Sequence, residues 1–283
     1  MKKPLVGALL GLLLVGASAA PALAAPSATS AKPAAKPAVK AVNFAGTVAL
    51  SNCSGSVVRM PNSQPNDPAL VLSNGHCLET GFPAAGEVIT DQPSSRSFSL
   101  LNAAGSKVAT LRAGKVAYAT MTDTDISIYQ LTTTYAKIQS QYGISALTLN
   151  DAHPTQGTAI KVVSGYWKRT YSCNVDGFVY RLKEGDWTWK DSVRYTSSCN
   201  TIGGTSGSPV IDTTTGKVVA VNNTGNEDGE RCTENNPCEV DQNGNVTVRQ
   251  GINYAEETYL IVPCVGAGNK IDLNRAGCTL PKP

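Results

Sequence analysis

Histidine is scarce in this chain, since its 283 residues include only two, His76 and His153. The eight cysteines contain no Cys-x-x-Cys pair. Zinc sites usually combine three or four Cys, His or carboxylate ligands at recognisable spacings, so these absences disfavour a metal centre. We therefore expect no metal ion.

A strongly basic surface is also lacking. The formal net charge is +3, but five of the 24 Lys and Arg residues lie within residues 1–40, which contain no Asp or Glu. The rest of the chain has 19 basic residues against 21 acidic ones. A charge of about −2 gives no support for nucleic-acid binding.

Long apolar runs are confined to the N-terminus. Two lysines precede an apolar run from Leu5 to Val15, and Ala22-Leu23-Ala24 forms a small-x-small cleavage site. This pattern predicts a secretory signal peptide over residues 1–24. No later stretch approaches the roughly 18 apolar residues of a membrane span, so we expect a secreted, extracellular protein that is not membrane-attached after signal cleavage. Residues 25–42 are rich in Ala, Pro, Ser and Lys, which predicts a linker or short pro-segment.

The most informative segment is 203–210, GGTSGSPV, in which small residues surround Ser206. Glycines beside a serine let a substrate carbonyl approach backbone N–H groups. The same composition is also typical of a tight turn between strands. The nucleophile elbow of α/β-hydrolases is disfavoured, because it needs glycine two residues after the serine and Ser208 stands there.

A nucleophilic serine needs a base, and a neutral histidine is the usual one. His76 follows the apolar stretch 69–72 and precedes Cys77, which predicts a position at the end of a strand. His153 lies in a polar loop rich in turn-forming residues, where we expect an exposed histidine with no role.

The third group of such a site is a carboxylate that orients the imidazole. Asp125 directly precedes the alternating segment 126–131, which is typical of a strand in a sheet. Asp123 is the alternative carboxylate, and Asp125 is favoured by its position at the strand start.

Taken together, these segments resemble the chymotrypsin-like serine proteases, and the secreted bacterial members in particular. The order His76, Asp125, Ser206 matches that family, whereas subtilisins and α/β-hydrolases arrange the same groups differently. The resemblance extends from about Gly46 to Val262. It implies an all-β protease domain over residues 43–283, with two antiparallel six-stranded β-barrels and an active-site cleft between them. The expected first barrel covers about 43–150, the second about 151–265, and a disulfide-tied tail covers 266–283.

Strand periodicity, taken by itself, favours an all-β barrel or sandwich, because short β-prone runs recur at intervals of roughly ten residues. The runs are Lys107–Arg112, Lys115–Thr120, Ala159–Ser164, Phe178–Lys183, Trp187–Arg194 and Lys217–Val221. A short helix is predicted over Tyr135–Tyr142, ended by Gly143, and Asn243-Gly244 predicts a hairpin turn between Val240 and Val246. We expect the three tryptophans, Trp167, Trp187 and Trp189, to pack against strands.

Eight cysteines in an exported chain predict disulfide bonds. The family resemblance implies a bridge from Cys77 back to Cys53, and the spacing suggests sequential partners for the rest. The expected pairs are Cys53–Cys77, Cys173–Cys199, Cys232–Cys238 and Cys264–Cys278. In the alternative pairing, Cys232 or Cys238 bonds to a cysteine nearer Ser206.

The resemblance implies that the chain hydrolyses a polypeptide substrate through an acyl-enzyme. In this scheme His76 takes the Ser206 proton, Asp125 orients His76, and the N–H groups of Gly204 and Ser206 stabilise the oxyanion. The implied mechanism needs no metal ion and no organic cofactor. Monomers are the default for such enzymes. Two alternatives stay open: a catalytically silent homologue that binds proteins, and a hydrolase of small esters or amides.

Two positions depart from the animal digestive members of the family. Thr205 replaces the aspartate that pairs with a new N-terminus, which implies a site that forms without zymogen-style activation. Asn200 falls where trypsin-like members have an aspartate, which disfavours strict trypsin specificity. The substrate pocket implied by the resemblance consists of Asn200, Asn223, Thr224, Gly225 and Gly251.

Overall fold

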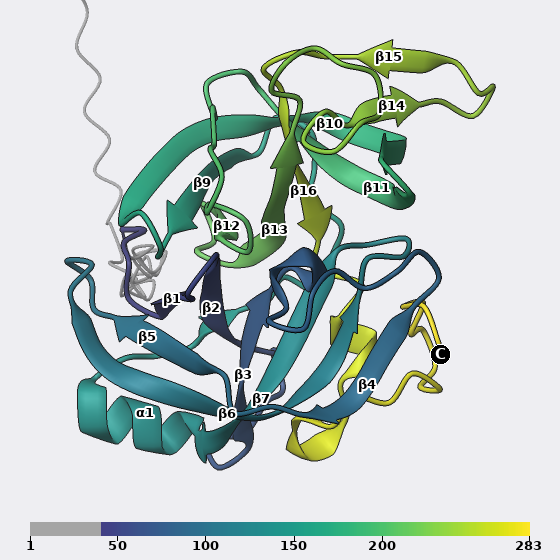
Figure 1. Cartoon of the computed structure of the whole chain (residues 1–283). Helices are drawn as coiled ribbons and strands as arrows, with labels where there is room; N and C mark the ends of the chain where they lie inside the picture. The colour runs from purple at the N-terminus through teal and green to yellow at the C-terminus, as the bar shows by residue number, and fades with distance from the viewer. Residues whose placement is uncertain (1–40) are drawn as a thin grey trace, which may run out of the picture. The chain divides into compact units, whose positions relative to one another are not determined.

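The computed structural model describes residues 41–283, which form two β-sheets that each close into a ring (Figure 1). The first ring has the strand order β1-β5-β6-β7-β3-β2, and β2 pairs back to β1. All its pairings are antiparallel. Its strands are β1 (Thr47–Ala49), β2 (Ser54–Arg59), β3 (Pro68–Ser73), β5 (Ser97–Leu101), β6 (Lys107–Thr120) and β7 (Ile126–Thr134). β4 (Val88–Pro93) pairs with β6, and β8 (Leu147–Thr148) lies parallel to β2.

The second ring has the order β11-β16-β13-β12-β9-β10, and β10 pairs back to β11. Its pairings are also antiparallel. Its strands are β9 (Ala159–Ser164), β10 (Arg169–Glu184), β11 (Trp187–Tyr195), β12 (Pro209–Asp212), β13 (Val218–Gly225) and β16 (Asn253–Glu257). The hairpin of β14 (Cys238–Val240) and β15 (Val246–Val248) extends from β10. The predicted all-β architecture of two six-stranded antiparallel barrels is confirmed.

Strand β7 shows how the sequence pattern joins the two rings. Its alternating side chains are buried on both faces, because each face packs into a different hydrophobic cluster. Tyr129 and Leu131 pack in the cluster of the first ring, with Phe98. Ile126 and Ile128 belong to a cluster that also holds second-ring side chains, namely Val163, Ile211, Val218 and Val221. The two rings therefore share a hydrophobic interface that fixes the position of the start of β7.

The helix α1 (Tyr135–Tyr142) agrees with its prediction in both bounds, and Gly143 ends it in the left-handed conformation with φ of 67°. The Asn243-Gly244 hairpin is also confirmed, with Val240 paired to Val246. The two strands predicted at 107–112 and 115–120 are a single strand, because Gly114 forms a bulge within β6 and does not end it.

Short 3-10 helices complete the described secondary structure: η1 (Gly75–Cys77), η2 (Val262–Cys264) and η3 (Ala267–Asn269).

The four disulfides join Cys53–Cys77, Cys173–Cys199, Cys232–Cys238 and Cys264–Cys278, which are the sequential pairs expected. No helix among residues 41–283 has the length and apolar character needed to span a membrane. The predicted signal peptide lies outside the described residues, as does all of the predicted linker but residues 41 and 42.

Candidate active site

The three sequence-predicted groups all line one pocket at the junction of the two rings. His76 and Asp125 come from the first ring, and Ser206 comes from the loop between β11 and β12 of the second. The strand order explains how His76 meets Asp125. β3 and β7 are antiparallel neighbours, with Ser73 paired to Ser127, so the end of β3 and the start of β7 lie at the same end of the ring.

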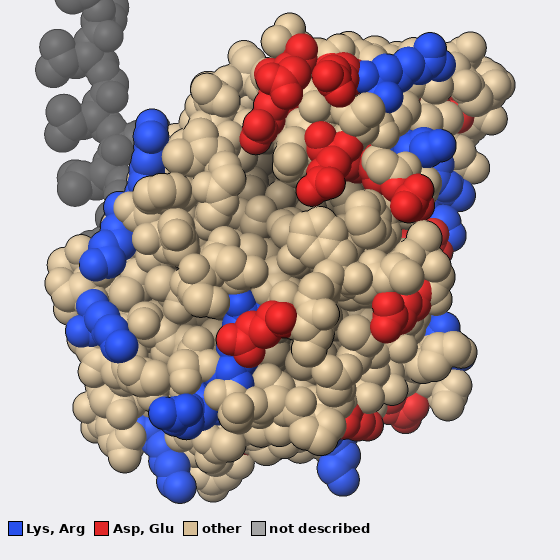
Figure 2. All heavy atoms as spheres, viewed as in Figure 1, with Lys and Arg blue, Asp and Glu red and all other residues tan. Residues whose placement is uncertain are grey.

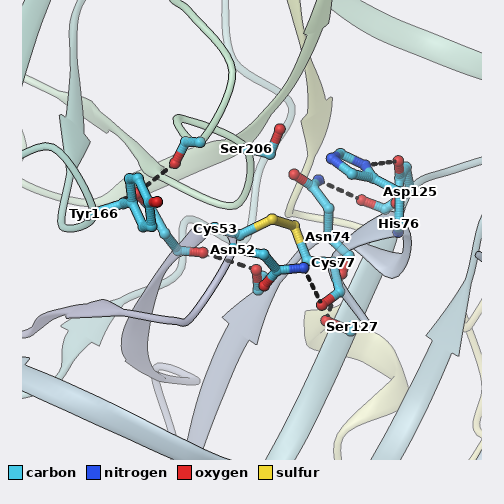
Figure 3. Close-up of a disulfide and its surroundings, with 12 residues drawn as sticks. Asn52, Cys53, Asn74, His76, Cys77, Asp125, Ser127, Tyr166 and Ser206 are labelled. Carbon is cyan, nitrogen blue, oxygen red and sulfur yellow. Dashed lines mark hydrogen bonds and ion pairs between the residues drawn. A yellow bond between two sulfur atoms is a disulfide. The ribbon is translucent and has the colours of Figure 1, made fainter. Parts of the chain in front are cut away.

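The carboxylate of Asp125 binds His76 at two points, of which Figure 3 shows the contact with the ring. Its Oδ2 lies 2.6 Å from Nδ1 of the ring, and its Oδ1 accepts the backbone N–H of His76 at 3.1 Å. Asp125 is fully buried. Gly75 lets the backbone before His76 lie close to Thr120 and to Asp125, because a Cβ at that position would overlap the carbonyl oxygen of Thr120. The alternative carboxylate, Asp123, forms an ion pair with Lys190 instead.

Neighbouring groups hold this pair in place. Asn74 donates from Nδ2 to the Asp125 carbonyl at 2.8 Å, and Ser127 Oγ donates to the Asn74 carbonyl at 2.7 Å (Figure 3). The Cys53–Cys77 disulfide anchors the residue that follows His76 to the start of β2. The orientation of the imidazole is therefore fixed by covalent and hydrogen-bonded contacts on several sides.

Burial and charge act in opposite directions on His76. Burial lowers its pKa, but the charge and hydrogen bond of Asp125, with smaller contributions from Glu184 and Glu234, raise the pKa above 6.5. The ring consequently becomes neutral at a higher pH than a free histidine does.

Ser206 lies in a loop that is tied to the first ring. The Ser206 carbonyl accepts the N–H of Ser54 at 2.8 Å, and the N–H of Gly207 donates to the Asn222 carbonyl at 2.9 Å. Gly207 has φ of +79°, and a Cβ there would overlap the Ser54 carbonyl. Any other residue would be strained by both its backbone conformation and the lack of space.

The Ser206 hydroxyl donates to the Asn223 carbonyl at 3.3 Å, and among the described residues it makes no hydrogen bond with His76. Of the two links expected between the three groups, the structure forms the one between His76 and Asp125. A rotation about the Cα–Cβ bond of Ser206 redirects its hydroxyl. Such hydrogen bonds are often long or misaligned in unliganded enzymes and tighten when substrate binds.

The N–H groups of Gly204 and Ser206 have no acceptor within residues 41–283. The Gly203 carbonyl accepts the indole N–H of Trp167 at 2.7 Å. Because a trans peptide points its C=O and N–H in opposite directions, this bond directs the Gly204 N–H away from Trp167. We expected Trp167 to pack against strands. Its side chain is instead half exposed, and its indole N–H binds the Gly203 carbonyl in the serine loop.

Thr205 closes the turn before Ser206. Its hydroxyl exchanges hydrogen bonds with Ile202, accepting the Ile202 N–H at 3.0 Å and donating to the Ile202 carbonyl. The Thr205 N–H also donates to the Ile202 carbonyl, at 3.0 Å. The fully buried threonine thus stabilises the loop through local contacts, with no ion pair.

Asn223, Thr224 and Gly225 line the pocket, whereas Asn200 and Gly251 do not. Sequence reasoning missed several residues that do, namely Phe82, Glu184, Trp187, Glu227 and Glu234. Figure 2 shows acidic side chains around the hollowed part of this face. These residues carry no local motif, and only the folding of distant loops brings them together.

The chain belongs to the trypsin-like peptidase family, because the model of the trypsin-like peptidase domain matches residues 53–221. This range includes His76, Asp125 and Ser206. The fold is that of a trypsin-like serine protease.

Solved structures that match the chain include the MamO protease domain from Magnetospirillum magneticum and the active form of the Rv3671c protease from M. tuberculosis. The first is 12% identical with a TM-score of 0.48, covering 77% of this chain and 95% of that chain. The second is 14% identical with a TM-score of 0.47, covering 85% of each chain. No curated protein matches the chain at a significant level.

We predict that the imidazole of His76 titrates above pH 6.5 and that Asp125→Asn lowers its midpoint, since the largest raising contribution is lost while burial persists. NMR of the ring resonances in a Ser206→Ala background measures this, and His153 serves as the internal control. A midpoint unchanged by Asp125→Asn contradicts the interpretation.

Proposed function

We propose that the chain is a secreted serine endopeptidase that hydrolyses peptide bonds through His76, Asp125 and Ser206. The observation that carries the proposal is the His76–Asp125 pair, which lines the same pocket as Ser206 at the junction of the two barrels. Nδ1 of His76 is occupied by Asp125, so Nε2 is the nitrogen left to accept a proton.

In the proposed mechanism, neutral His76 takes the Ser206 proton as the serine oxygen attacks the substrate carbonyl. Asp125 stabilises the imidazolium that forms. The free N–H groups of Gly204 and Ser206 donate to the developing oxyanion. His76 then protonates the leaving amine, and water hydrolyses the acyl-enzyme by the same route. Residues 1–24 as a signal peptide, together with four disulfides, support export.

Labelling with a fluorophosphonate probe tests this function. We expect the wild-type protein to be labelled and to cleave casein, and Ser206→Ala to lose both, with kcat lower by roughly 10⁶. Ser208→Ala, two residues away in the same loop, is the matched control and should keep both activities. Proteolysis unaffected by Ser206→Ala excludes the proposed nucleophile, while absence of labelling in folded wild-type protein indicates a silent homologue. Labelling and ester cleavage without peptide cleavage indicate a small-ester hydrolase.

The acidic wall of the pocket supports a preference for substrates with basic side chains. Glu184, Glu227 and Glu234 line the pocket, and none forms an ion pair within the described part of the chain. Glu184 is 7% exposed, and its Oε2 is buried with no hydrogen-bond partner. Burial raises the pKa of Glu184. A substrate cation would supply the missing partner for this carboxyl.

We predict that cleaved peptide libraries are enriched in Lys or Arg near the scissile bond, and that Glu184→Gln reduces kcat/KM for these peptides about tenfold or more while neutral peptides are little affected. Glu87→Gln, an exposed carboxylate outside the pocket, is the control. Equal cleavage of acidic and basic peptides by the wild-type protein contradicts the preference.

We predict that Trp167→Phe lowers kcat about twofold to tenfold with little change in KM. The substitution keeps an aromatic ring but removes the N–H that holds the Gly203 carbonyl, and one hydrogen bond contributes about 0.5–1.5 kcal/mol. Steady-state kinetics on a peptide substrate measure the effects on kcat and on KM separately. A change confined to KM would indicate that Trp167 only contacts substrate.

A further inference from the structure

The second histidine of the chain, His153, lies outside the active-site pocket and is held by several contacts. Its ring is packed against Phe178, with centroids 4.3 Å apart, and against the edge of Tyr259 at 5.2 Å. Its side chain is 39% exposed. The sequence predicted an exposed histidine with no role. In the structure, the ring of His153 is instead held in a defined position, with one side open to solvent.

The backbone fixes which ring nitrogen of His153 carries a proton. Nδ1 lies 2.6 Å from the Pro154 carbonyl oxygen, and a carbonyl oxygen can only accept. Nδ1 therefore carries the hydrogen, and in a neutral ring Nε2 presents its lone pair. Histidines that bind metals usually make this kind of contact, donating the other ring N–H to a carbonyl or carboxylate.

The lone pair of Nε2 faces two carboxylates. Asp191 Oδ2 lies 3.0 Å away and Glu257 Oε1 lies 3.2 Å away. Glu257 has 1% of its side chain exposed, and neither of its oxygens has a hydrogen-bond partner of acceptable geometry within residues 41–283. Three electron-pair donors therefore lie close together, and a metal ion or a proton among them would relieve their mutual repulsion.

We propose that His153 Nε2, Asp191 Oδ2 and Glu257 Oε1 form a binding site for a divalent transition-metal ion, with zinc as the ion that fits this donor set. The three atoms lie within 4.8 Å of one another. A tetrahedral zinc ion about 2.1 Å from each donor sets the donors about 3.4 Å apart, close to the two distances observed. Ca²⁺ and Mg²⁺ prefer all-oxygen ligands, so the imidazole disfavours them.

The surroundings suit a metal with one open position. Asp191 is 40% exposed beside the exposed edge of His153, so water can complete the coordination from the solvent side. Tyr259 lies with its hydroxyl 3.4 Å from Asp191 Oδ2 and can orient this ligand. The ligands come from the loop before β9, from β11 and from the end of β16, so the ion would join three separate segments of the second barrel.

A proton is the competing occupant. A proton on Nε2 of His153 would be donated to Asp191 Oδ2 at 3.0 Å. Burial, together with the charges of Asp191 and Glu256, raises the pKa of Glu257 to about 10 and so favours the neutral form of this carboxyl. Zinc and this proton would compete for the same position, and the experiment must separate them.

Zinc titration of the untagged Ser206→Ala chain, followed by calorimetry and thermal unfolding, tests the proposal. We expect one zinc ion per chain and a rise in Tm of about 5–10 °C when free zinc is about a hundredfold above Kd. Glu257→Gln keeps the shape of the side chain and should weaken binding at least tenfold, as should His153→Ala. Asp151→Asn, an exposed carboxylate on the same loop, should leave binding unchanged. CaCl₂ should produce no shift.

The two histidines make the location of the ion decidable. Zinc binding that survives His76→Ala and is lost in His153→Ala supports the site, whereas the reverse result assigns the ion to the active site and overturns the proposal. Nitrogen-15 NMR of the imidazoles gives a readout that does not depend on variant folding, because zinc should shift Nε2 of His153 and leave His76 unmoved. Absence of binding at millimolar zinc means that the cluster holds only a proton.

Discussion

The buried carboxylate of Asp125 is the constraint on which the geometry of the candidate active site depends. An ionised carboxylate loses its hydration on burial, and the loss is tolerable only when hydrogen bonds replace the water. His76 provides two of these bonds, from its ring and from its backbone N–H. Because β7 begins beside the end of β3, the antiparallel pairing of these two strands decides where both residues lie. The imidazole orientation thus follows from sheet topology and from the electrostatic requirement of one buried group.

The loop that carries Ser206 depends on the first barrel although it belongs to the second. The carbonyl of Ser206 accepts a hydrogen bond from the Ser54 N–H. Gly207 fits against the Ser54 carbonyl only because it has no side chain. The shared cluster around Ile126, Ile128 and Val221 holds the two barrels at this spacing. Preorganised N–H donors act on a transition state only when they do not have to move, so these cross-barrel contacts would support the proposed chemistry as well as the fold.

The sequence predicted what local patterns determine. Local physical rules explain three of these patterns: the small residues around Ser206, the alternating strand after Asp125 and the glycine after residue 142. The order of His76, Asp125 and Ser206 along the chain then made the family recognisable. The same reasoning split β6 at Gly114, because a glycine that forms a bulge cannot be told from one that ends a strand without knowledge of the pairing partner. Glu184 and Trp167 were missed for a related reason. Their roles depend on contacts with Asn235 and Gly203, which lie 51 and 36 residues away along the chain.

The two histidines show how one residue type supports two kinds of site. Each lies beside a carboxylate that is almost completely buried, so composition around them does not distinguish them. The difference is which nitrogen the surroundings occupy. Asp125 takes Nδ1 of His76 and leaves Nε2 toward the pocket, which suits a nitrogen that must gain and lose a proton. The Pro154 carbonyl takes Nδ1 of His153 and turns Nε2 toward two carboxylates, which suits a nitrogen that holds a cation permanently. The two proposed roles, a proton carrier at His76 and a metal ligand at His153, therefore differ through one side-chain contact and one backbone contact at Nδ1.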